Sequence, residues 1–156
     1  MSAGPFVLFA ANIADLNMSD LVSASVHLAL VDYNAGNPID SSSAGDTLWS
    51  DLSADEIAAG DGYSAGGVAL SNVIATPITG GFQCSSDTVE FIATGTGIAS
   101  WRYAVMFVNG TLWGKSSPLI GYFLGNSADA DIPLTPGGGP LQLFCPVDGW
   151  FRQTRA

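Results

Sequence analysis

The sequence has very few basic side chains. Its 156 residues include four lysines and arginines against fourteen aspartates and glutamates, which gives a formal net charge of −10. Proteins that bind nucleic acids use Lys and Arg to displace counterions from phosphates, and polybasic segments hold proteins at anionic membranes. The shortage of positive charge therefore argues against nucleic acid and membrane surfaces as partners.

Charge of either sign is also scarce. Charged residues make up 12% of the chain and hydrophobic residues 47%, whereas charge usually accounts for about 25%. Disordered chains combine low hydrophobicity with high charge, so the composition excludes that class. A surface of Ser, Thr, Asn, Gly and Ala loses little on desolvation, which suits a subunit that packs against neighbours. The alternative is an acidic protein that is merely soluble.

Long apolar runs and clusters of metal ligands are missing as well. No run reaches the roughly 18 residues of a membrane span, and Met1–Ala11 lacks the basic flank of a secretory signal. We therefore expect synthesis or assembly in a cytoplasm. The two cysteines, Cys84 and Cys145, match no metal spacing. Without secretion, two buried thiols are the preferred interpretation, and a disulfide is the alternative.

The glycines and prolines indicate the fold class. The 19 glycines and 8 prolines separate short apolar runs, a rhythm typical of all-β proteins. We predict a single domain over residues 1–156 that is mainly β, a β-sandwich or jelly-roll-like fold with one or two short helices. Strands are expected at Phe6–Ala10 (an edge strand), Ser25–Asp32, Gly67–Thr76, Thr88–Ala93, Trp101–Asn109, Leu119–Leu124 and Leu141–Val147.

Two segments favour helix. Ala10–Leu21 could hold a turn or two, and Ser53–Ala59 carries a capping-box pattern in which Ser53 is followed by Glu56. In the strand Trp101–Asn109 both faces are apolar, so both are expected to be buried, with Trp101 on the same face as Tyr103, Val105 and Phe107.

The chain offers little catalytic chemistry. His27 is the one histidine, and no nucleophile elbow accompanies it. The carboxylates near residues 51–61 fit helix capping and turns, and Asp129 and Asp131 fit a loop. That last pair could supply oxygens to calcium but lacks EF-hand spacing. We predict no catalytic, cofactor-binding or metal-binding residue, and hence a protein that is not an enzyme.

The four tryptophans bear on binding. Trp101 is predicted to be in the core, and Trp150 lies near the end of the chain. Trp49 and Trp113 lie beside turns. Either they form a contact surface, for example for sugars, or they close the ends of the sandwich.

One set of segments carries a resemblance. Asp46–Ile57 contains Trp-Ser-Asp-Leu, Gly62–Leu70 contains Gly-Tyr-Ser-Ala-Gly-Gly, Trp101–Phe107 contains Arg-Tyr-Ala-Val, and Ser117–Tyr122 contains Pro-Leu-Ile-Gly-Tyr. In this order the segments resemble a group of small tailed-bacteriophage virion proteins. The residues that carry the motif are Trp49, Glu56, Tyr63, Gly66, Gly67, Trp101 and Pro118.

The resemblance implies a capsid cement or decoration protein on the outer surface of the virion, assembled in the host cytoplasm. Its implied partners are the major capsid protein and copies of itself, without a cofactor. Met1–Ala10 and Cys145–Ala156 depart from the pattern, and residues 1–9 and 148–156 are expected to be extended arms that contact the shell or a sister copy. A tail-associated adhesin that binds host glycans is the alternative, and a polysaccharide-degrading enzyme is a third hypothesis.

Overall fold

A computed structural model of the protein describes residues 3–154. Its centre is a five-stranded antiparallel sheet with the strand order β1-β10-β7-β2-β3. Strands distant in sequence are therefore neighbours in space, since β2 pairs with β7 along its whole length. The five strands are β1 (Val7–Leu8), β10 (Leu119–Leu124), β7 (Tyr103–Val108), β2 (Val26–Val31) and β3 (Val68–Ala69).

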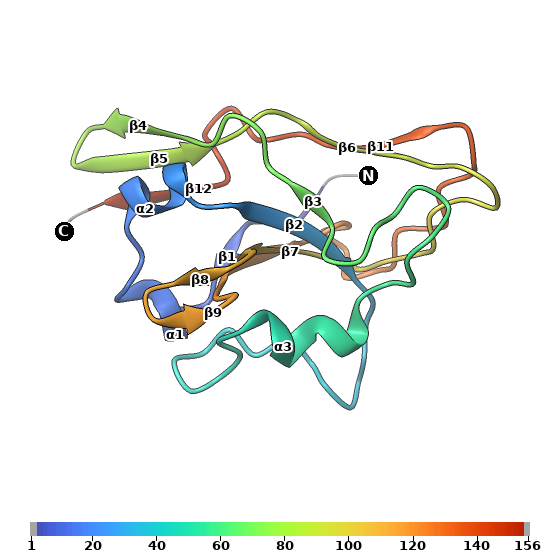
Figure 1. Ribbon diagram of the computed structural model, residues 1–156, viewed down its shortest axis with the longest axis horizontal. Helices are drawn as coiled ribbons and strands as arrows, with labels where there is room; N and C mark the ends of the chain where they lie inside the picture. Colours follow the sequence, from blue (N-terminus) through green and yellow to red (C-terminus); the bar gives the residue numbers. More distant parts are fainter. Residues whose placement is uncertain (1–2, 155–156) are drawn as a thin grey trace.

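A second layer of strands covers one face of this sheet (Figure 1). It consists of a three-stranded sheet, β12-β5-β4, and the pair β11-β6, and we call it the strand layer. The main core lies between the two layers and joins residues from Leu16 to Phe151. The mainly β, sandwich-like prediction is thus confirmed. The strands are β4 (Ile74–Ile78), β5 (Gly81–Ser85), β6 (Val89–Ile92), β11 (Pro140–Leu143) and β12 (Phe151–Thr154).

The opposite face is covered by residues 32–56, which we call the loop layer (Figure 1). Its only regular elements are the helical turn α3 (Trp49–Leu52) and a 3₁₀ turn (Ser53–Asp55). Leu52 packs there against Val31, Val105 and Phe107 in a second core. Strands β2 and β7 are consequently buried on both faces, which was predicted for Trp101–Asn109 only.

Two short helices and a hairpin lie at one end of the sandwich (Figure 1). Asn17 caps the second helix by accepting a hydrogen bond from the Ser19 amide at 3.0 Å. Ala10–Leu21, which was expected to hold a turn or two of helix, thus contains one short helix and the start of a second. The elements are α1 (Ala10–Ile13), α2 (Met18–Ser23), β8 (Thr111–Leu112) and β9 (Lys115–Ser116).

The prediction of a helix over Ser53–Ala59 with a Ser53–Glu56 capping box is wrong. The helical turn begins four residues earlier, at Trp49, because the Asp51 carboxylate accepts hydrogen bonds from the Thr47 and Leu48 amides, both at 2.9 Å. Glu56 follows the 3₁₀ turn in an extended conformation. Its carboxylate is held by groups from another segment.

Several strand bounds also differ from expectation. The predicted strand Gly67–Thr76 is broken into β3 and β4 at Asn72, whose φ of 52° ends the extended conformation. Leu141–Val147 is strand only as far as Leu143. The sequence patterns missed β5, β12 and the β8–β9 hairpin altogether.

Trp101 lies on the other side of the central sheet from the one predicted. It packs in the main core with Ala104 and Met106, whereas Tyr103 and Val105 face the loop layer. The regular alternation of side chains between the two faces of the sheet begins only at Tyr103, where β7 starts. Trp101 precedes the strand, so extending the alternation back to it assigns the indole to the wrong face.

The described parts of the two expected arms are built into the sandwich. Near the N-terminus, β1 pairs with β10, and Phe9 is buried against the loop layer. Near the C-terminus, β12 pairs with β5, and Trp150 and Phe151 belong to the main core. The prediction of extended arms is therefore wrong for residues 3–9 and 148–154, and the ends 1–2 and 155–156 lie outside the described residues.

Candidate interaction surfaces

Three of the motif residues, Glu56, Tyr63 and Gly66, meet in one polar network. The Tyr63 hydroxyl accepts a hydrogen bond from the Leu30 amide at 3.0 Å and donates one to Glu56 Oε1 at 2.7 Å. The Gly66 amide donates to the same carboxylate oxygen at 2.6 Å. Burial raises the pKa of Tyr63 far above its usual value, and the Glu56 carboxylate adds to the rise. The network joins the loop layer to the edge of the central sheet.

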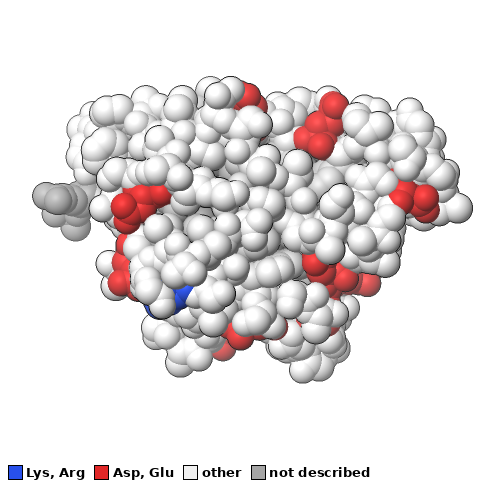
Figure 2. Space-filling view, in the orientation of Figure 1, with Lys and Arg blue, Asp and Glu red and all other residues white. Residues whose placement is uncertain are grey.

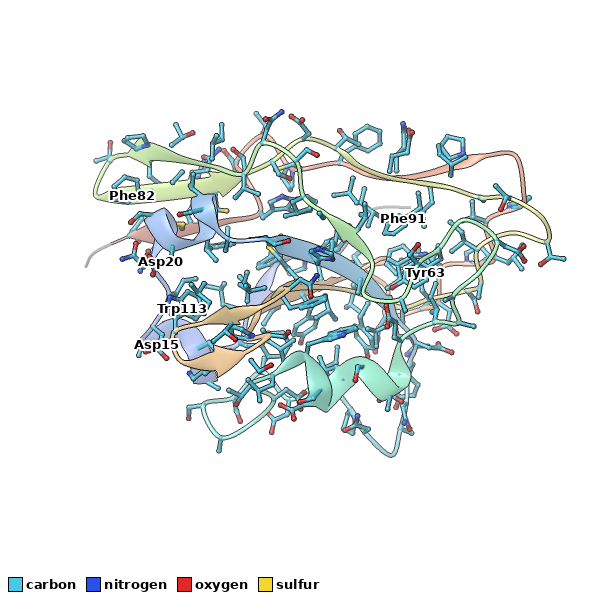
Figure 3. The ribbon with its side chains drawn as sticks, viewed as in Figure 1. Asp15, Asp20, Tyr63, Phe82, Phe91 and Trp113 are labelled. Atoms are coloured by element: carbon cyan, nitrogen blue, oxygen red, sulfur yellow. The ribbon has the colours of Figure 1, made fainter. Side chains whose placement is uncertain are left out.

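Gly67 is required by a close approach of two backbones. Its φ is +68°, and a Cβ there would lie 2.0 Å from the Leu28 carbonyl oxygen. Tyr63 packs beside Phe91, with the ring centroids 5.5 Å apart (Figure 3). Tyr63 and Gly67 therefore fix how the chain between the loop layer and β3 reaches the sheet.

The remaining motif residues are also part of the fold. Trp49 stacks on Phe107, with ring centroids 4.4 Å apart. Pro118 precedes β10, and its carbonyl accepts a hydrogen bond from the Val108 amide at 3.0 Å. The motif thus positions the loop layer on the sheet and brings together no set of reactive groups.

Asn12 is a buried amide that links three parts of the chain. Its Nδ2 donates to the carbonyls of Thr47 and Leu119, both at 2.8 Å, and its Oδ1 accepts from Lys115 Nζ at 2.8 Å. Lys115 also pairs with Asp15 at 2.7 Å. These contacts satisfy every polar atom of the side chain, so we assign Asn12 a structural role.

None of the four tryptophans is exposed. Trp101 and Trp150 are buried, and Trp49 and Trp113 are half-buried. The Trp113 Nε1 donates to Asp20 at 3.0 Å, which holds the β8–β9 hairpin beside α2 (Figure 3). The adhesin alternative predicts an exposed aromatic pair in a groove, and the tryptophans do not supply one.

The other candidates for chemistry lie apart. His27 Nδ1 donates to the Gly66 carbonyl at 2.9 Å, and its Nε2 faces Asn109 Nδ2 at 3.4 Å. Asp131 and Asp129 pair with Arg102, at 2.7 and 3.6 Å. Among residues 3–154, no group of three or more His, Cys, Asp or Glu side chains is arranged to hold a metal ion.

Both cysteines are free thiols. Cys84 is buried, and Cys145 is half-buried. Burial, together with the nearby Cys145, raises the pKa of Cys84 to about 12. The Cys84 thiol is therefore protonated at neutral pH and unreactive.

Every described basic side chain is neutralised within the chain. Lys115 pairs with Asp15, Arg102 with Asp131, and Arg152 with Asp148. Most of the fourteen acidic residues have no such partner. Figure 2 shows the result on one face, where acidic side chains form small separate groups on a mostly uncharged surface. A partner would therefore meet an uncharged or acidic surface.

Two hollows interrupt the described surface. One, of about 1160 Å³, lies between α1–α2 and the β4–β5 hairpin, and we call it the helix groove; Phe82 and Ile74 line it. The other, of about 780 Å³, lies between residues 3–6 and residues 141–150. We call it the aromatic cleft. Its lining includes Phe6, Trp101, Phe123, Leu141, Phe144 and Trp150.

Comparisons with protein-family models, with curated proteins and with solved structures find no match to this chain. In the part of the chain that the structure describes, no helix has the length and apolar character to cross a membrane.

Proposed function

We propose that this chain is a non-enzymatic virion structural protein of a tailed bacteriophage, a cement or decoration protein that binds the outer surface of the capsid. Its partners would be the major capsid protein and further copies of itself. The resemblance of Asp46–Ile57, Gly62–Leu70 and the two later segments to small phage virion proteins suggests the class.

The observation that carries the proposal is the character of the surface. Lys115, Arg102 and Arg152 are all occupied by internal ion pairs, and the face of the molecule drawn in Figure 2 is largely uncharged. Exposed apolar side chains are present as well, notably Phe144 and Val147. Such a surface suits protein–protein packing, in which charged residues are depleted at the centre of the interface.

The charge supports the outer rather than the inner side of the shell. With a formal net charge of −10, the chain would be repelled by packaged DNA, which is a dense polyanion. A position on the outside avoids that repulsion.

Capsids from a phage that lacks this gene test the proposal. Purified protein should bind them to saturation at hundreds of copies per capsid, whereas a tail adhesin would be present at about a dozen per virion. Binding should also raise the temperature at which the capsids release DNA, because a ligand stabilises the state that it binds. Absence of binding to capsids, with binding to isolated tails, would contradict the proposal.

A further inference from the structure

Among residues 3–154, the most exposed large apolar side chains lie beside the aromatic cleft. Val147 is 94% exposed and Phe144 is 67% exposed. Both belong to the segment between β11 and β12, and Phe144, Pro146 and Asp148 line the cleft itself. Exposed apolar groups next to a concave apolar wall are typical of a binding surface.

The segment that carries Val147 is held in place. The Gly149 amide donates to the Pro146 carbonyl at 2.8 Å, and Gln83 Nε2 donates to the Val147 carbonyl at 3.2 Å. Asp148 is paired with Arg152 on β12. Val147 is therefore presented at the tip of an anchored turn, so little conformational entropy would be lost when a partner covers it.

The wall behind the turn is equally well fixed. Phe6 stacks on Phe151, with ring centroids 5.5 Å apart, and Phe123 stacks on Trp150 at 5.7 Å. The Trp150 amide and indole nitrogen donate to Cys84 and Ser86 of the neighbouring strand segment, at 2.7 and 2.9 Å. The cleft thus exists before binding, with a ring-lined floor that can receive an apolar side chain.

The charges around the cleft indicate which charged residues the partner surface carries. The chain carries a net charge of −10, and the Arg152 guanidinium near the cleft is already paired with Asp148. The Glu90 carboxylate on the adjacent β6 accepts a hydrogen bond from the Gln142 side chain and takes part in none of the ion pairs found among residues 3–154. A lysine or arginine would meet complementary potential at this rim, whereas an acidic residue would be repelled.

The helix groove is the weaker candidate. Its walls include the short α1–α2 segment and Thr154, which adjoins the residues outside the described part of the chain. Nothing in its surroundings indicates what would cover it, so its exposed residues are suitable controls.

We infer that the aromatic cleft and the Phe144–Val147 turn are the contact surface for the capsid subunit, and that they receive an apolar side chain flanked by at least one lysine or arginine. This inference rests on the proposed function and adds the contact site and the chemistry of the partner surface.

Two substitutions that place opposite charges at position 147 test both parts of the inference. In co-sedimentation with capsids that lack this protein, Val147→Asp should weaken binding about tenfold, the effect of losing a central apolar contact. Val147→Lys should weaken it further, because it adds repulsion from the partner's cation. The matched controls Ile74→Asp and Ile74→Lys change an exposed residue of the helix groove and should bind like the unaltered protein.

Circular dichroism and the urea midpoint verify that each variant is folded, as expected for exposed positions. If the unaltered protein does not bind capsids, the proposed function fails. If it binds and the Val147 variants bind equally well, or the Ile74 variants lose as much, the assignment of the cleft is overturned. A larger loss for Val147→Asp than for Val147→Lys would overturn the basic partner.

Discussion

The two faces of the central sheet are covered by layers of different construction. The strand layer covers one face with backbone ladders and a large apolar core that contains Leu28 and Phe91. The loop layer covers the other face with a smaller core around Leu52. It is held largely by carboxylates that accept hydrogen bonds from nearby backbone or side-chain amides. These carboxylates belong to Asp40, Asp46, Asp51 and Asp55.

The two layers therefore contribute differently to the stability of the protein and to its dependence on pH. Burial of apolar area supplies most of the stability and is insensitive to pH. Carboxylate hydrogen bonds shape a segment with little regular structure, but they depend on the ionisation of the acids. The strand layer should therefore set global stability, and the loop layer should respond to its solvent conditions.

Equivalent truncations in the two cores should give the largest effects. Leu28 and Leu52 are both 0% exposed, so Leu28→Ala and Leu52→Ala remove the same atoms. We expect Leu28→Ala to lower the free energy of unfolding by about 4 kcal/mol and Leu52→Ala by about 2 to 3 kcal/mol, because the loop layer can relax into the cavity.

Urea unfolding followed by tryptophan fluorescence measures both values. An equal or larger loss for Leu52→Ala would mean that the loop layer is as rigid as the strand layer.

The polar link between the layers should give an intermediate effect. Tyr63→Phe leaves the buried Leu30 amide without its acceptor, which should cost about 1 to 3 kcal/mol of unfolding free energy. Glu56→Gln is the control, since its amide oxygen can still accept from Tyr63 and Gly66. A greater loss for Glu56→Gln, measured by thermal unfolding, would show that the carboxylate charge matters more than the hydroxyl.

The smallest effect concerns pH and the loop layer. Burial raises the pKa of Asp46 above its usual value of 3.8, and Asp51 and Asp40 add to the rise. A raised pKa in the folded state means that the folded protein binds the proton more tightly, so stability falls as pH rises through the window from 3.8 to the raised value.

Asp46→Asn should therefore stabilise the protein at pH 7, by at most about 0.5 kcal/mol because solvent screens this partly exposed group. The gain should vanish below pH 3.8, where the aspartate is protonated in both states. A gain that is equal at pH 3 and pH 7 would indicate a cause other than ionisation.

The sequence predicts the centre of the fold better than its edges. Strands β2, β6, β7 and β10 were predicted within two residues because their apolar residues are continuous or alternate. Strand β5 contains only Phe82 and Cys84 as large apolar residues, and β12 contains only Phe151. Strand β12 is defined by its pairing with the distant β5, which no local pattern encodes. Strand β5 is also the second strand of a hairpin with β4, which its few apolar residues did not indicate.

The helix prediction failed for a related reason. Ser53 and Glu56 fit a capping box locally, but Asp51 caps the earlier turn, and Glu56 is bound by Tyr63 and Gly66 from outside the helix. Local propensity was overridden by tertiary contacts.

The aromatic cleft could not be predicted from the sequence. Its rings come from positions as distant as Phe6, Trp101, Phe123 and Trp150. The one local signal was the pair Phe144 and Val147, two large apolar residues in a segment punctuated by Pro146 and Gly149. The sequence pattern placed both in the predicted strand Leu141–Val147, whereas strand β11 ends at Leu143.

The strand order of the central sheet has a consequence for biosynthesis. Strand β2 pairs with β7, whose residues follow it by more than seventy positions, and the core is completed only by Trp150 and Phe151. Such nonlocal pairings slow folding. The apolar N-terminal strands remain unpaired until the ribosome has synthesised the strands with which they pair. During that interval aggregation and chaperones compete for the chain, so a cooler host, in which apolar association is weaker, should raise the yield of folded protein.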